Sequence, residues 1–488
     1  MSDIDIAVVG AGPAGVAAAV TAAQAGARVL LIDEQGRAGG QYFKQPAAAL
    51  AGSQFPPALA ANIQKGRELL AGLAHARIVQ RLHTLVWDVT PDRTLRLYTA
   101  GQEGRADVVE SLTAKRLIIA AGAYERVMPF PGWTLPGVMT VGGAQLLLKG
   151  QGLLPGRRLL LAGTGPLLQV AGVQLHQAGA EIAAIVELQG GGQFLSRAFD
   201  FWGHWDKVGQ ALDQRRQLAR AGVPFKTGRV VIRALGEQCV TGAVIGKVDG
   251  DGRLLPRSQE TLQVDTICLN FGFVPATELT RLAGCRQRFD PHFGALATET
   301  NEEMETSQPG IFAVGEVRGI GGVDVALIEG QIAGAVAARQ LGYQAAEVAP
   351  AQWEAWRRAR SVVESLGAMF PLRPGLCELA TDEVVVCRCE EVTAGEIREA
   401  ARGGATDLNA LKTWTRAGMG RCQGRVCGPI IAQMLAQATG LPVEAAGAFT
   451  ARPPLKPLPL AALAAHASAA MQWEDHATQY GYVRTKNQ

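Results

Sequence analysis

The segment Ile4–Glu34 reads IDIAVVGAGPAGVAAAVTAAQAGARVLLIDE, and it decides the fold of the first part of the chain. A short apolar run leads into glycines, an alanine-rich stretch follows, and a second apolar run ends in acidic residues. This pattern predicts a strand, a tight turn, a helix and a second strand, which is the βαβ unit of a nucleotide-binding α/β fold.

Three glycines in this segment, Gly10, Gly12 and Gly15, have the G-x-G-x-x-G spacing of a dinucleotide-binding turn. Gly10 permits the turn, Gly12 lets a pyrophosphate reach the backbone, and Gly15 lets the helix pack on the strand. The helix N-terminus presents free N–H groups to the phosphates. Asp33 closes the second strand, where an acid that binds a ribose hydroxyl is expected.

The segment Arg157–Leu188, RRLLLAGTGPLLQVAGVQLHQAGAEIAAIVEL, repeats this plan and predicts a second nucleotide-binding unit. Gly163 and Gly165 fit the fingerprint, whereas Leu168 replaces the third glycine and should widen the contact between helix and strand. Glu187 ends the second strand, and its carboxylate favours a free ribose over a 2′-phosphate. Two interpretations stay open, an NAD-type pocket and a retained fold that binds no nicotinamide.

Three further segments carry a resemblance to a known fold. They are AGGQYF at Ala38–Phe43, KRLIIAAGAYER at Lys115–Arg126, and QPGIFAVGEVRGIGGVDVALIEGQIAG at Gln308–Gly334. With the first unit they resemble the two-domain FAD- and NAD-binding flavoprotein fold, closest to the thioredoxin-reductase type. The resemblance implies FAD in the first unit.

The same resemblance implies roles for individual residues. Glu316, where the family usually has Asp, binds the ribityl chain of the flavin, and the helix that starts near Val325 aims its positive end at the flavin's pyrimidine edge. The candidate FAD-binding residues are Gly10, Gly12, Ala14, Gly15, Asp33, Glu34, Gly40, Gln41, Ala121, Gly122, Gly315, Glu316 and Val325. Disulfide reductases of this fold carry a cysteine pair beside the flavin, but the corresponding segments here have no cysteine, so electrons need another exit.

Four cysteines gather near the end of the chain, in VVVCRCEE from Val384 and GRCQGRVCG from Gly420. They are Cys387, Cys389, Cys422 and Cys427. A capping box, TAGE at Thr393–Glu396, predicts a helix start, and further helices are expected over 408–416 and from Arg425 to 434. This arrangement brings four thiols to one end of a small helical unit, as an iron–sulfur ligand set, a structural zinc site or two disulfides.

The spacing C-x-C, about thirty residues, then C-x-x-x-x-C, resembles the helical 2Fe–2S domain of bacterioferritin-associated ferredoxin. By this resemblance each of the four cysteines is a cluster ligand. Arg388, Arg421 and Arg425 lie in the same neighbourhood, where they offset the cluster's negative charge or are ordinary solvated charges.

Composition narrows the remaining classes. The chain has 488 residues, a formal net charge of +3 and eight cysteines, so we expect several domains, no nucleic-acid surface and no disulfide scaffold. No apolar run reaches the ~18 residues of a membrane helix, and no leader peptide precedes the first strand. We therefore expect a soluble, cytoplasmic protein.

The expected organisation is α/β, with one nucleotide-binding domain inserted in another. The expected parts are an FAD domain at 1–145 and 290–345, an NAD-type Rossmann domain at 146–289, a helical linker at 346–382, an all-α 2Fe–2S domain at 383–442, and an extended C-terminal arm at 443–488. The amphipathic segment 351–367 predicts the linker helix, and the proline-rich ARPPLKPLPLAALA from Ala451 predicts the arm.

Over nearly its whole length the chain resembles the larger flavin/iron–sulfur subunit of multi-subunit amino-acid and opine dehydrogenases, a group that includes opine oxidases, hydroxyproline and proline dehydrogenases, and hydrogen cyanide synthase. The resemblance implies an electron-transfer role, with substrate oxidised on a separate flavin subunit related to D-amino-acid oxidase and a small ferredoxin-like subunit in some members. Some relatives hold FMN at the subunit interface, and some hold a plain adenine nucleotide in place of FAD.

Two other functions remain open at this point. One is a self-sufficient NAD(P)H-dependent flavin/2Fe–2S oxidoreductase that uses the second unit as its hydride site. The other is a scaffold with redox-inactive nucleotide domains and a structural zinc. No catalytic nucleophile–base pair is recognisable, and the sequence names neither substrate nor final acceptor.

Overall fold

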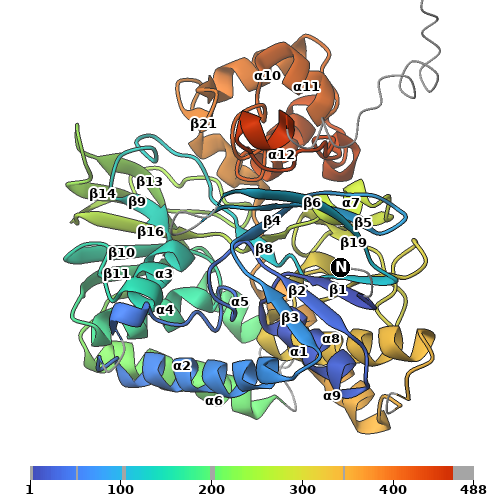
Figure 1. Ribbon diagram of the computed structural model, residues 1–488. Helices are drawn as coiled ribbons and strands as arrows, with labels where there is room; N and C mark the ends of the chain where they lie inside the picture. Colours follow the sequence, from blue (N-terminus) through green and yellow to red (C-terminus); the bar gives the residue numbers. More distant parts are fainter. Residues whose placement is uncertain are drawn as a thin grey trace, which may run out of the picture.

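The computed structural model describes residues 4–50, 53–101, 106–197, 200, 204–344 and 347–464. Two α/β domains lie side by side, and a small helical module lies across one side of them (Figure 1). The predicted α/β class with parallel Rossmann-type sheets is confirmed.

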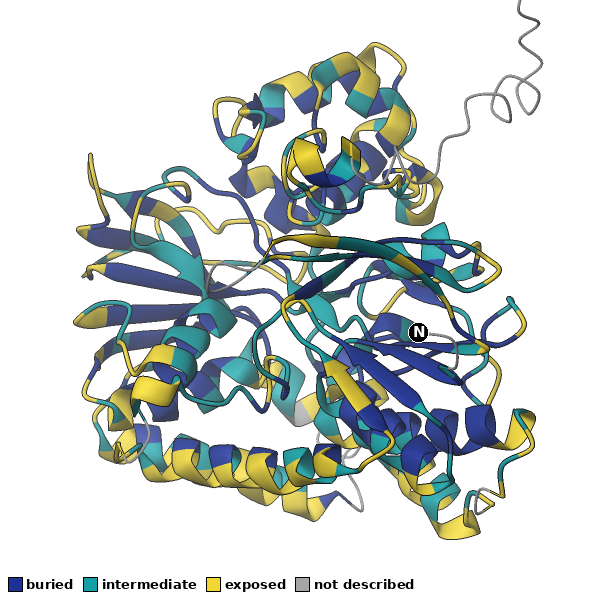
Figure 2. Cartoon of the chain, in the orientation of Figure 1, coloured by how far each residue is buried: buried dark blue, intermediate teal, exposed yellow. Residues whose placement is uncertain are grey.

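The first domain is built on a parallel sheet with the strand order β20-β7-β1-β2-β3. Its strands are β1 (Ile6–Val9), β2 (Val29–Ile32), β3 (Ile78–Arg81), β7 (Arg116–Ile119) and β20 (Ile311–Ala313). One face packs on α1 (Pro13–Gln24) and α8 (Gly322–Gln340). The other face packs on an antiparallel sheet of β4 (Thr84–Val89), β5 (Thr94–Thr99) and β6 (Val108–Thr113). β1 and β2 are buried along their whole length because both faces of the sheet are covered, as Figure 2 shows in dark blue.

Helices α1 and α8 touch through their backbones, which fixes the two ends of the discontinuous first domain. A Cβ atom at Gly330 would lie 2.2 Å from the carbonyl oxygen of Ala14, and one at Gly334 would lie 2.4 Å from that of Ala18. Only glycine permits this approach, since real Cβ atoms do not come so close to backbone oxygen. The contact places the N-terminal end of α8 beside the glycine turn of Gly10–Gly15.

The second domain repeats the architecture with the strand order β12-β11-β10-β16-β9. Its parallel strands are β9 (Val138–Thr140), β10 (Arg158–Gly163), β11 (Glu181–Glu187), β12 (Phe225–Thr227) and β16 (Thr266–Asn270). The covering helices are α3 (Val141–Gln151), α4 (Leu167–Gln177) and α6 (Trp205–Arg220), with α2 (Pro57–Ala71) alongside (Figure 1). An antiparallel sheet of β13 (Arg229–Leu235), β14 (Gly242–Lys247) and β15 (Glu260–Gln263) completes the domain.

The expected boundary of this domain at residue 146 is displaced. It would cut through α3, and β9 already pairs with β16 of the second sheet. The sequence before α3 is too short and irregular to show that β9 joins this sheet, because its partner lies over one hundred residues further on. The two domains are joined by β8 (Ala123–Glu125), which pairs antiparallel with β17 (Phe273–Pro275).

After the nucleotide domains, α9 (Pro350–Met369) packs on α8 and leads to the cysteine module. The module contains a hairpin of β21 (Val385–Cys387) and β22 (Val392–Thr393), followed by α10 (Ala394–Arg402), α11 (Leu408–Thr415) and α12 (Gly428–Thr439). Thr393 and Glu396 form the predicted capping box. The module shares one continuous apolar core with the second domain, in which Val386, Ile397 and Leu435 join Phe130 and Val231.

Two details of the module differ from the all-α expectation. Cys387 ends a strand rather than lying in a loop, because Val384–Val386 supply β-branched residues that pair with β22. Helix α12 begins at Gly428 rather than near Arg425, since Pro429 fits the first turn of a helix and the preceding glycine-containing segment forms a turn.

The proline-rich segment that follows the module has no regular secondary structure over 451–459 and lies on the first domain. The backbone N–H of Leu455 donates to the carbonyl of Trp87 at 2.9 Å, and Lys456 forms an ion pair with Glu34. The predicted arm therefore covers a surface of its own chain as far as residue 464, and its remainder, 465–488, lies outside the described residues.

Candidate functional site

The first glycine turn is shaped by close backbone contacts. Gly10 has φ +102°, and a Cβ there would lie 2.3 Å from the carbonyl oxygen of Ala120. A Cβ at Gly15 would lie 1.8 Å from the carbonyl oxygen of Gly10. These two glycines are required by packing, as their places in the fingerprint predict.

Gly12 and Gly40 face each other across the mouth of this turn. A Cβ at Gly40 would lie 2.7 Å from Cα of Gly12, whereas one at Gly12 would meet only Gly40, at 3.9 Å. Gly122 borders open space, with no atom within 4 Å of where its Cβ would lie. Backbone lined by glycine on both sides fits an extended pyrophosphate beside the N-terminus of α1.

The acid at the end of β2 lies next to this turn. Asp33 accepts hydrogen bonds from the backbone N–H of Ala11 at 2.6 Å and of Gln35 at 2.7 Å, and it stays partly exposed. Burial raises the pKa of Asp33. Its neighbour Glu34 is exposed and forms the ion pair with Lys456, so the arm ends at the ribose side of the candidate site.

On the opposite side, Gly315 and Glu316 follow β20 and precede α8. Gly315 has φ +69°, and its Cβ would press on that of Ala14 at 3.1 Å, so the segment lies against the start of α1. Burial raises the pKa of Glu316 to about 7. Val325 is 1% exposed and packs inward, so only the backbone of α8 faces the site at that position.

A carboxylate that the sequence motifs did not predict holds this segment in place. Glu329 is fully buried in α8, where its side chain accepts from the N–H of Gly315 at 2.8 Å and from Nε1 of Trp356 at 3.1 Å. It also forms an ion pair with Arg318. The available signal was a single carboxylate within the alanine- and glycine-rich part of α8, where an unpaired charge would be costly.

Of the other predicted residues, Ala14 is buried beneath the turn, Ala121 is half-buried, and Gln41 is exposed. The structure thus brings the glycine turn, Asp33, the Gly39–Gly40 loop and the Gly315 segment around one surface. These elements fit FAD because the cradle is lined by glycine and backbone and is flanked by two helix N-termini.

The second glycine turn is arranged differently. A Cβ at Gly163 would lie 1.7 Å from the carbonyl oxygen of Asn270, while Gly165 has no neighbour within 4 Å of its Cβ position. Glu187 is 2% exposed, and burial raises its pKa to about 7. Leu168, in the place of the third glycine, is fully buried in the domain core.

The four cysteines lie close together in two pairs. The Sγ atoms of Cys389 and Cys422 are 3.9 Å apart, too far for a disulfide bond. Cys387 accepts a hydrogen bond from the thiol of Cys427, which lowers the pKa of Cys387 to about 6 and raises that of Cys427. All eight cysteines of the chain are free thiols.

The loop that carries Cys422 is compact because of its glycines. A Cβ at Gly420 would lie 2.1 Å from Cβ of Cys389, and one at Gly424 would lie 2.2 Å from the Phe449 ring. The Gly418 N–H donates to Sγ of Cys387 at 3.5 Å. These contacts bring the GRCQG segment against the C-x-C hairpin.

The three neighbouring arginines have different surroundings. Arg425 is 8% exposed and is paired with Glu278 at 3.2 Å, so its charge is already compensated. The Arg388 guanidinium stacks over the Trp133 ring at 5.4 Å, and Arg421 is exposed. Arg421 is therefore the most open of these cations to solvent.

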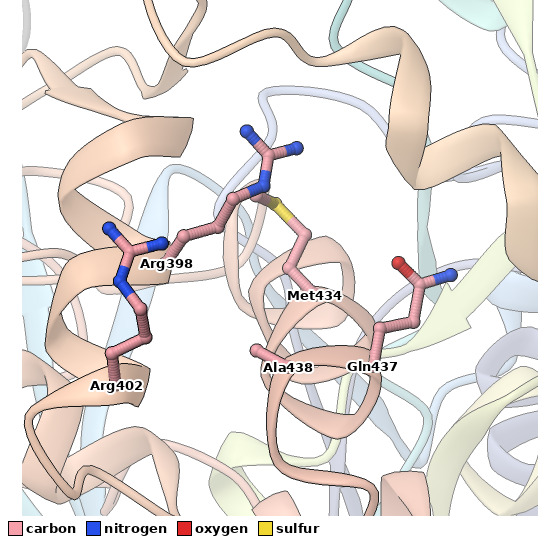
Figure 3. Close-up of a pocket in the computed structure, with 5 residues that line it drawn as sticks. All are labelled: Arg398, Arg402, Met434, Gln437 and Ala438. Carbon is pink, nitrogen blue, oxygen red and sulfur yellow. The ribbon is translucent and has the colours of Figure 1, made fainter.

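A separate pocket of about 290 Å³ lies between α10 and α12, lined by Arg398, Arg402, Met434, Gln437 and Ala438 (Figure 3). Arg398 is already paired with Asp382, and no thiol lines the pocket. Among the described residues, no group of three or more His, Cys, Asp or Glu side chains is placed to hold a single metal ion. The described helices include none that is long and apolar enough to cross a membrane.

The family model for pyridine nucleotide-disulphide oxidoreductases matches residues 4–347, which include both nucleotide units. The chain belongs to this family. The membership makes it an oxidoreductase of the FAD-binding flavoprotein class, in agreement with its two parallel sheets. A second model, the sarcosine oxidase A3 domain, matches residues 382–467 and includes the cysteine module.

Relatives of this oxidoreductase extend over the whole chain. An opine oxidase subunit of Rhizobium meliloti (strain 1021) is 33% identical over 95% of this chain and 99% of its own length. Hydrogen cyanide synthase subunit HcnB of Pseudomonas aeruginosa is 33% identical over 93% of this chain and 97% of its own. The crystal structure of L-proline dehydrogenase from P. horikoshii has the same fold, with a TM-score of 0.65 at 20% identity over 94% of this chain and 79% of that one. The predicted resemblance to this group is confirmed.

Proposed function

We propose that this chain is the electron-transferring subunit of a heteromeric, flavin-dependent amino-acid or opine dehydrogenase. It takes electrons from a partner flavin subunit related to D-amino-acid oxidase, and a small ferredoxin-like subunit completes some complexes of this kind. The names of the most similar relatives, both subunits of heteromeric enzymes, support a subunit role.

The observation that carries the proposal is the pairing of Cys387 with Cys427 and of Cys389 with Cys422 in a module that shares its core with the second nucleotide domain. Two pairs of thiols suit a 2Fe–2S cluster, in which each iron needs two sulfur ligands from the protein. In the proposed holoprotein these four cysteines hold the cluster, and the first glycine turn holds FAD.

A bound flavin exchanges two electrons or one, and an iron–sulfur cluster carries one. The chain's own residues position the two groups. Glycine-lined backbone from Gly12, Gly40 and Gly122 receives the dinucleotide, and the hairpin and Gly420 loop close around the thiols. A cytoplasmic location is part of the proposal, because a reducing compartment keeps eight thiols free.

The test is purification of the native complex, followed by measurement of flavin, iron and acid-labile sulfide per chain and by electron paramagnetic resonance of the dithionite-reduced protein. We expect FAD, a co-purifying flavin subunit, equal amounts of iron and sulfide, and a 2Fe–2S signal. A colourless protein that contains zinc and no iron would contradict the proposal. So would a lone chain that oxidises substrate without a partner.

A further inference from the structure

The two glycine turns of this chain are internal duplicates, so their surroundings can be compared directly. At the first turn, Gly12, Asp33 and Gly40 are all partly exposed. At the second, Thr164 is 3% exposed and Glu187 is 2% exposed. The second turn is therefore covered, although its strands and helix repeat the plan of the first.

The acid of the second unit is turned into its own loop. Oε1 of Glu187 accepts hydrogen bonds from Oγ1 of Thr164 at 2.7 Å and from the N–H of Gln189 at 3.0 Å. Oε2 accepts from the N–H of Gly165 at 3.0 Å. In a working unit the acid binds the ribose hydroxyls and the glycine N–H groups face the pyrophosphate. Here these groups satisfy each other.

The segment after α9 lies over this acid. Gln189, which is 1% exposed, donates from Nε2 to the carbonyl of Pro371 at 2.9 Å and accepts at Oε1 from Arg373 at 2.9 Å. Next to it, Nε2 of Gln193 donates to the carbonyl of Ala368 at 3.2 Å. The segment Ala368–Arg373 thus runs across the end of β11, where the ribose of a bound dinucleotide would lie.

The same segment is fixed on its other side, so it is a built part of the domain. A Cβ at Gly252 would lie 2.5 Å from Cβ of Arg373, and Gly375 donates its N–H to the carbonyl of Asp251 at 2.9 Å. Leu376 is fully buried in the core that the cysteine module shares with the second domain. The rings of Phe194 and Phe370 meet edge to face, 5.8 Å between centroids.

We propose that the segment Ala368–Arg373 closes the second nucleotide site, so that the protein binds no nicotinamide dinucleotide there and accepts no hydride from NADH. The closure rests on the contacts above. The consequence for electron flow rests on the proposed function: a chain that takes no hydride from NADH receives its electrons from the partner flavin subunit.

The first test uses the full-length holoprotein under anaerobic conditions. With about 1 mM NADH, at the upper end of usual KM values, we expect the flavin absorbance to stay that of the oxidised form. We also expect NAD⁺ to leave hydrogen exchange of the Gly163–Gly165 and Glu187–Gln193 amides unchanged. Bleaching of the flavin, or protection of these amides by NAD⁺, would overturn the closure. Iron content and partner co-purification are separate readouts, so failure here is distinguishable from failure of the proposed function.

The second test removes the cover. Arg373→Ala should accelerate hydrogen exchange at the Gly165 and Gln189 amides by about tenfold, because the cover that Arg373 holds over Gln189 is loosened. Arg357→Ala on the exposed face of α9 is the matched control and should leave both amides unchanged. Equal exchange in wild type and Arg373→Ala would show that this segment is not the cover.

Discussion

Nε of Arg425 donates a hydrogen bond to the Tyr124 hydroxyl at 2.9 Å, while Nη1 of the same guanidinium donates to the carbonyl of Cys422 at 3.1 Å. Tyr124 lies two residues after Gly122, on the strand that leaves the first glycine-lined cradle. One buried side chain therefore joins the cradle to the cysteine loop. Burial raises the pKa of Tyr124 to about 12, so its hydroxyl remains protonated at neutral pH.

Removing this side chain should be costly. Arg425→Gln leaves Glu278, which is 15% exposed, without its cation, and breaking a buried pair from one side costs roughly 3–5 kcal/mol. Urea denaturation of the full chain measures the loss. Arg416→Gln is the matched control, because its pair with Glu390 involves a 69% exposed arginine and should change stability by less than about 1 kcal/mol. Equal losses in the two variants would contradict the buried role of Arg425.

The thiol pairs make a prediction about the metal centre. Cys422→Ser should abolish the visible absorbance and paramagnetic signal of the cluster and leave bound flavin largely intact, because the flavin cradle lies in another domain. Cys239→Ser, which changes an exposed thiol outside the module, should alter neither. Full iron content in Cys422→Ser would remove this residue from the ligand set.

The contact of α8 with α1 should be sensitive to one methyl group. Gly330→Ala places Cβ 2.2 Å from the Ala14 carbonyl oxygen, and the forced shift should cost about 1–3 kcal/mol and weaken FAD binding. In Gly209→Ala the new methyl group has no atom within 4 Å, and alanine in the α6 helix should stabilise by roughly 0.5–1 kcal/mol. Thermal unfolding and flavin retention measure both effects. A neutral Gly330→Ala would contradict the backbone contact.

Glu187 should make stability depend on pH. Burial raises its pKa from the ordinary value of 4.5 to about 7, so the folded state holds a proton that the unfolded state has lost within this window. Stability therefore falls as pH rises from about 4.5 to 7, by at most about 1.4 kcal/mol per pH unit. Glu187→Gln should remove this part of the slope in urea denaturation at pH 5 to about pH 8. An unchanged slope would show that the acid is ionised when buried.

Local patterns in the sequence predict much of this protein. The first glycine turn, the capping box at Thr393, the helix over α9 and the gathering of four cysteines all follow from spacing within a few turns of chain. Glu329 was missed because its partners, Gly315, Arg318 and Trp356, lie on other elements and leave no periodic signal.

The cover over the second glycine turn was equally invisible. Gln189 and Arg373 are 184 positions apart, and each is an ordinary polar residue in its own segment. The sequence could therefore show that the fingerprint at Leu168 is incomplete, but only the folded chain shows what lies over Glu187. Contacts between distant segments decide whether a repeated nucleotide fold still has an open mouth.

The cysteine module is fastened at both ends. Before it, Gly375 is hydrogen-bonded to the second domain, and after it, Leu455 and Lys456 are bound to the first. A carrier domain that shuttles on a flexible tether would have neither anchor. If this chain relays electrons, they cross a gap of constant width, and the rate of that crossing is set by the rigidity of the scaffold rather than by a swinging motion.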